Sequence, residues 1–130
     1  MLYFLKGMKR IGMTDKNRED LRARVFSTKD LVAYQEGAIA SRMIINRPAG
    51  NITIFSFDKN EGLSEHTSPY DAMVSILEGE YEVIVSGATH LMEQGETIIF
   101  PANAPHAVSA VTRFKMMLVM IKELDRPGQS

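Results

Sequence analysis

Two stretches of this sequence decide its fold: GLSEHTSPYDAMVSILEG at residues 62–79 and GETIIFPANAPH at residues 95–106. Each contains a run of β-branched, aromatic or other apolar residues of strand length, next to the glycine, proline and asparagine residues that are typical of turns. Each also carries one histidine, His66 in the first stretch and His106 in the second. The two stretches therefore predict strands and turns that bring imidazole side chains into the fold.

The same pattern continues outward along the chain. Strands are expected at residues 38–45, 52–57, 73–77, 81–85, 97–100 and 114–121, with turn signals between them. Their close spacing leaves no room for crossover helices, so we expect antiparallel pairing in a sandwich or barrel. The last of these segments is apolar at nearly every position and is predicted to be buried on both faces.

The composition indicates one globular domain without a nucleic-acid or membrane partner. The chain has 130 residues, of which 45% are hydrophobic and 24% are charged, and its formal net charge is -1. That charge gives no basic field for phosphate backbones or anionic lipid. Because the sequence has no cysteine, any metal ion must be bound by histidine, aspartate, glutamate or water.

The residues at both ends are expected to lie outside the domain. Residues 1–25 form a charged arm in which Thr14 is able to cap a short helix, and a loosely ordered leader is the alternative. The barrel is expected at residues 26–123, and the tail 124–130 is expected to fray. The apolar run in residues 1–6 is too short for a signal peptide, so we expect a cytoplasmic protein.

The stretch at residues 62–79 resembles the first motif of the cupin family. That motif is a glycine, then His-any-His, three or four residues, a glutamate, six residues and a glycine. His66 and Gly79 match it, whereas Ser68 stands at the second histidine and Ala72 at the glutamate. Two of the four usual metal-ligand positions therefore lack their usual residue.

The stretch at residues 95–106 resembles the second motif of the same family. Gly95, Pro101 and His106 match its opening glycine, its proline and its histidine, while Asn103 and Ala110 depart from it. The resemblance implies an all-β jelly-roll (double-stranded β-helix) cupin barrel with a short N-terminal charged arm. It also implies a homodimer, because the open edges of such sheets are commonly covered by another chain.

In a typical cupin, three histidines and one glutamate hold Fe, Mn, Ni or Zn, and the resemblance leaves His66 and His106 for that role here. Asp71 precedes the glutamate position and becomes a third candidate metal ligand if the turn at Pro69 is irregular. Ser68 lies two residues after His66, so on a continuous strand both side chains point to one face. Ser68 is therefore a candidate to bind a ligand, with an ordinary turn residue as the alternative.

These residues leave three candidate functions. The first is a small-molecule-binding protein with a degenerate metal site, catalytically weak or inactive, in which a divalent metal is weakly bound or absent. The second is a metal-dependent dioxygenase or isomerase acting on a small organic acid or aromatic compound, and the third is an accessory protein that uses the barrel for association. For the first two, the rings of His66 and His106 must face each other across one cavity, with their nitrogens roughly 3 to 5 Å apart. The alternative is that His66 and His106 are retained in the pocket but neither bind a ligand nor take part in a reaction.

Overall fold

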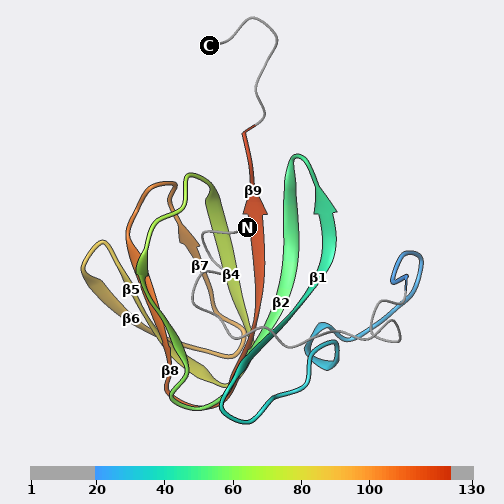
Figure 1. Ribbon diagram of the computed structural model, residues 1–130, viewed down its shortest axis with the longest axis horizontal. Coiled ribbons are helices and arrows are strands. Elements are labelled where there is room, and N and C mark those ends of the chain that lie inside the picture. Colours follow the sequence, from blue (N-terminus) through green and yellow to red (C-terminus); the bar gives the residue numbers. More distant parts are fainter. Residues whose placement is uncertain (1–19, 124–130) are drawn as a thin grey trace, which may run out of the picture.

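The computed structural model describes residues 20–123, in which almost all regular structure is β (Figure 1). A single 3-10 turn, η2 (Thr28–Asp30), precedes the strands of this part of the chain. The strands are β1 (Ile39–Arg47), β2 (Gly50–Phe57), β3 (Gly62–His66), β4 (Asp71–Glu78), β5 (Glu80–Val85), β6 (Ala88–Glu93), β7 (Thr97–Phe100), β8 (His106–Ala110) and β9 (Phe114–Ile121).

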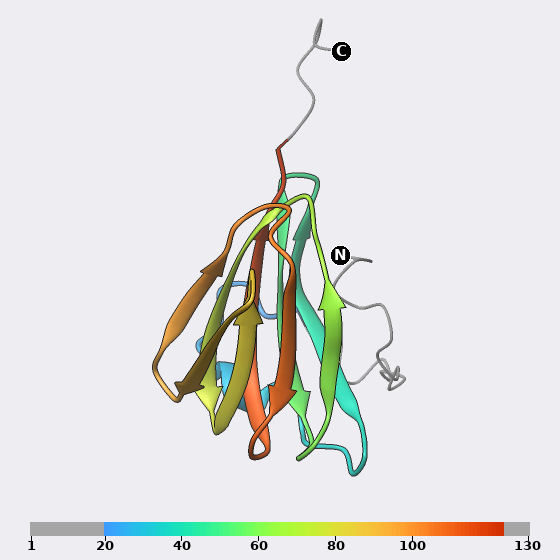
Figure 2. The same ribbon diagram turned by 90° about the vertical axis from the view of Figure 1, so that its left-hand side faces the viewer.

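The strands form two antiparallel sheets. One has five strands in the order β1-β2-β9-β4-β7, and the other has four in the order β3-β8-β5-β6. Figure 1 shows the first sheet on the right and the second on the left, and Figure 2 turns the second toward the reader. This arrangement confirms the predicted jelly-roll barrel.

The core lies between the two sheets and is built around strand β9, which pairs with β2 on one side and β4 on the other. Its first residue, Phe114, stacks on Phe57 at 4.4 Å and on Tyr81 at 4.8 Å between ring centroids. Each such pair contributes about 0.5–1.5 kcal/mol beyond the area it buries. Most residues of β9 are buried, as its continuous apolar sequence predicted.

The segment before β1 covers part of the outer face of the five-stranded sheet. Leu31 and Val32 pack there with Ile54, Leu77 and Met117 in a second, smaller apolar cluster. Burial of this part of the outer face explains why β2 and β9 carry apolar residues on both sides there, whereas a sheet with one wet face alternates.

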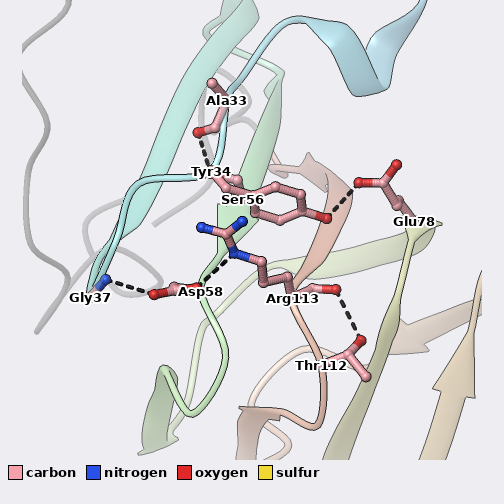
Figure 3. Close-up of polar contacts among 8 residues, drawn as sticks. All are labelled: Ala33, Tyr34, Gly37, Ser56, Asp58, Glu78, Thr112 and Arg113. Atoms are coloured by element: carbon pink, nitrogen blue, oxygen red, sulfur yellow. Dashed lines mark hydrogen bonds and ion pairs between the residues drawn. The ribbon is translucent and has the colours of Figure 1, made fainter.

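A polar cluster fixes the same segment at the end where β9 begins (Figure 3). The Tyr34 hydroxyl donates to Glu78 at 2.6 Å, and the Arg113 guanidinium and Lys115 ammonium each lie 4.8 Å from the Tyr34 ring centroid. Cations over an aromatic face are attracted by its quadrupole. Burial of Tyr34, together with its bond to Glu78, raises the pKa of the phenol.

Asp58 completes the cluster by joining β2 to both neighbouring segments (Figure 3). Its carboxylate accepts the Gly37 N–H at 2.7 Å and Arg113 Nε at 2.8 Å. These two bonds lower the pKa of Asp58, since both favour its charged form. The segment before β1 is therefore held by apolar packing and by charge-assisted hydrogen bonds.

Residues 1–19 and 124–130 lie outside the described part, and with them most of the predicted arm and the predicted tail. Residues 20–25, the part of the arm that is described, contain a turn and no helix. Within residues 20–123, no helix has the length and apolar character needed to cross a membrane.

Candidate functional site

His66 and His106 meet at one point of the four-stranded sheet. His66 ends β3, His106 begins β8, and the two residues are direct partners in the antiparallel ladder. Their ring centroids lie 4.3 Å apart with an interplanar angle of 68°. The rings come together as expected, but as neighbours on one sheet and not from opposite walls of the barrel.

The backbone sets the tautomer of both rings. Nδ1 of His66 donates to the Ser64 carbonyl at 2.7 Å, and Nδ1 of His106 donates to the Ala104 carbonyl at 3.0 Å. Because a carbonyl oxygen only accepts, each Nδ1 must carry the proton, and Nε2 of a neutral ring then keeps its lone pair. Both Nε2 atoms are buried. The pair therefore presents two enclosed lone pairs, as metal-ligating histidines do.

His106 is held in an apolar setting that keeps its ring neutral. Its side chain is 2% exposed, and the Phe100 ring stacks on it at 4.4 Å between centroids. Burial lowers the pKa of His106, and the nearby His66 lowers it further, against the opposing effect of the Ala104 carbonyl. The His106 ring is therefore neutral at neutral pH.

Ser68 lies in the turn after β3 and not on the strand. The expectation that it shares a strand face with His66 is wrong, because β3 ends at His66. The buried Ser68 hydroxyl accepts the Tyr70 N–H at 3.2 Å, and the Ser68 carbonyl accepts the Asn103 N–H at 2.7 Å. Ser68 therefore ties its turn to the loop that leads into β8.

Asp71 does not join the imidazole pair. It is the exposed first residue of β4, and the next residue, Ala72, is the buried one, so the Asp71 side chain points away from the core. Its Oδ1 accepts the Ala102 N–H at 2.9 Å, which positions the loop before His106. No three His, Asp or Glu side chains among residues 20–123 form a group that could hold a metal ion. The expectation of Asp71 as a metal ligand is therefore not supported.

Asn51 is a buried polar residue that the motif comparison did not single out. It is the second residue of β2, its side chain is 2% exposed, and both its amide nitrogen and its amide oxygen are buried. Thr53 and Phe55 follow it at intervals of two and are also buried. The period of two is the signal in the sequence that places Asn51 on the inner face.

Comparison with known proteins agrees with the fold and with the motifs. Residues 53–122 match the model of the family described as Cupin domain. The chain belongs to the cupin family. No curated protein matches this cupin.

Solved structures similar to this cupin span different lengths. A conserved protein of unknown function from Streptococcus pyogenes is 36% identical, with a TM-score of 0.77 over 92% of this chain and 100% of that one. A cupin 2 conserved barrel domain protein from Leptotrichia buccalis is 41% identical, with a TM-score of 0.70 over 72% of this chain and 46% of that one. A cupin superfamily protein from Desulfitobacterium hafniense is 24% identical, with a TM-score of 0.75 over 78% of this chain and 94% of that one, and shows the fold alone.

Proposed function

We propose that this cupin binds a small molecule at its imidazole pair, with a degenerate metal site and weak or no catalysis. The observation that carries the proposal is the pair of buried Nε2 lone pairs on rings 4.3 Å apart. Two acceptors fixed by backbone carbonyls form a preorganised site, because neither ring has to change tautomer to accept a ligand.

The pair fits a divalent cation only in part. Neutral imidazoles whose Nδ1–H groups are bonded to carbonyls are good donors for Zn, Ni or Fe. The part of the chain that the structure describes supplies no carboxylate or third imidazole to the same group. His66 and His106 would therefore hold an ion weakly, with its other positions filled by water or by the ligand. Such an ion would supply Lewis acidity.

Calorimetric titration of metal-free protein with Ni²⁺ tests this proposal. We expect weak binding at one site, and loss of one imidazole in His66→Ala or His106→Ala should weaken it at least about tenfold. His90→Ala is the matched control, since His90 is the third histidine of the sequence and lies exposed on β6.

Tight stoichiometric binding that survives replacement of both site histidines would refute the assignment. Tight binding that requires both histidines would instead favour the alternative, a metal-dependent dioxygenase or isomerase acting on a small organic acid or aromatic compound.

We further propose a cytoplasmic homodimer. The outer face of the five-stranded sheet carries one apolar side chain from each strand at the same level, here called the outer row: Ile45, Ile52, Val119, Met73 and Ile99, each registered to the next. Ile45 is 50% exposed and Ile99 is 61% exposed. A second copy of the chain on this face would remove the row from water, which is favourable for apolar surface.

A further inference from the structure

We propose that Asn51 is a third ligand-contacting residue of the imidazole site, and that the ligand is an uncharged molecule bearing hydroxyl groups. This inference rests on the proposed function, because it assumes that the imidazole pair binds a small molecule. It adds a residue outside both cupin motifs and restricts the chemistry of the ligand.

The register of the five-stranded sheet places Asn51 at the same end of the barrel as the imidazole pair. Asn51 lies opposite Met120 on β9, Met120 lies opposite Ala72 on β4, and Ala72 lies opposite Phe100 on β7. These four buried residues form one level of the inner face, near the end where β9 stops in Figure 1. The Phe100 ring stacks on His106, so this level of one sheet adjoins the imidazole pair of the other.

The amide of Asn51 is buried without a partner. Its side chain is 2% exposed, and neither Nδ2 nor Oδ1 has a hydrogen-bond partner among residues 20–123. Burial of an amide without hydrogen bonds is costly, and nearly all buried polar groups in native proteins are paired. An inward asparagine on the same level of the barrel as a pair of imidazole acceptors is therefore best explained by a partner that a ligand supplies.

The groups at this site define the ligand by complementarity. The Asn51 amide offers two donors and an acceptor, whereas the Nε2 atoms of His66 and His106 offer acceptors. A hydroxyl group both donates and accepts, so a molecule with several hydroxyl groups satisfies all three side chains.

The charges of the core argue against an anionic ligand. Lys115 is the one buried lysine or arginine in the described part of the chain, and its ammonium donates to the Lys29 carbonyl at 2.7 Å on the outer face of the five-stranded sheet. A carboxylate beside Asn51 would meet no lysine or arginine of residues 20–123 on the inner face, and a buried charge without a partner is strongly unfavourable. An uncharged polyol is therefore preferred.

Titration of ¹⁵N-labelled protein with glycerol and with erythritol tests the inference. We expect the side-chain amide signals of Asn51 to shift together with the ring signals of His66 and His106, and acetate to leave them unmoved. Asn51→Leu should weaken polyol binding about tenfold or more. The same variant should raise the thermal midpoint of the free protein, because it removes an unpaired amide from the interior.

Tyr81→Phe is the matched control. The Tyr81 hydroxyl is also buried without a hydrogen-bond partner among residues 20–123, but its ring stacks on Phe114 at the opposite end of β9. Its removal should also raise the thermal midpoint while leaving polyol affinity unchanged.

The outcomes separate the inference from the proposed function. Imidazole signals that respond to a polyol while those of Asn51 stay fixed would overturn the inference and leave the proposed function standing. Acetate that shifts the Asn51 signals in place of the polyols would overturn the ligand class. A lowered midpoint in Asn51→Leu would show that the amide has a structural partner, and so would overturn its role. Failure of every signal to respond to any probe would count against the proposed function as well.

Discussion

At the scale of single residues, the protonation of His106 links stability to pH. Burial holds its pKa below the ordinary value of 6.5, so the unfolded chain binds this proton more readily than the folded one. The contribution of His106 to stability is therefore fully present above about pH 6.5 and is lost as the pH falls through the window below that value.

The thermal midpoint, measured from neutral pH down to about pH 5, checks this sign. We expect it to fall with pH in the wild type and to fall less steeply in His106→Gln, which cannot take up the proton. His90→Gln should follow the wild type, since His90 is exposed. Parallel slopes for the wild type and His106→Gln would contradict the prediction.

The candidate site could be predicted from the sequence in part. His66 and His106 occupy motif positions, so their meeting was foreseeable, whereas their placement on one sheet depends on the β3–β8 pairing. Asn51 was not predicted as a strand residue, because the turn signals between the expected strands include residues 46–51. Once the strand is extended to Gly50, the period of two places Asn51 on the inner face. Asp71 was a candidate only if the turn at Pro69 was irregular, and on the regular strand β4 its side chain points away from the core.

At the scale of elements, the turn between β4 and β5 requires glycine for two reasons. Gly79 has φ of +83°, and a Cβ there would collide with the carbonyl oxygen of Arg113. Gly87, in the β5–β6 turn, has nearly the same φ of +84°, but a Cβ there would meet no atom within 4 Å. The two glycines therefore differ in the space around them and not in backbone conformation.

Urea unfolding of Gly79→Ala and Gly87→Ala separates the two effects. Gly87→Ala should cost about 1 kcal/mol of the free energy of unfolding, the strain of a left-handed alanine. Gly79→Ala should cost at least ~3 kcal/mol, because the collision with backbone adds to the same strain. Equal losses in the two variants would show that the turn shifts freely to accept a side chain.

The two sheets were unequally predictable. All five strands of the first sheet were expected, whereas of the second sheet only β5 was, and β3, β6 and β8 were missed. The first sheet is covered in part on its outer face by Leu31 and Val32, so its central strands are apolar on both sides there. Strand β6 shows the opposite case, since five of its six residues are exposed and its sequence resembles a loop.

At the scale of the whole molecule, the homodimer is a prediction that light scattering with size exclusion can check. At micromolar concentration we expect the wild type to be a dimer and Ile99→Glu, which places a charge in the outer row, to be a monomer. Leu91→Glu is the control, because Leu91 is 65% exposed, close to the 61% of Ile99, but belongs to the other sheet. A monomeric wild type, or equal loss of the dimer in both variants, would rule out association through this face.

The pairing of the two histidines has a mechanical consequence. Strand β3 is an edge strand, joined to its sheet through β8 alone, and its register with β8 shifts between Leu63 and His66. A molecule or ion that bridges the two rings also fastens the end of this strand to its neighbour. Fraying of the sheet edge breaks that bridge, so the occupant is held by both rings no longer than the edge stays closed.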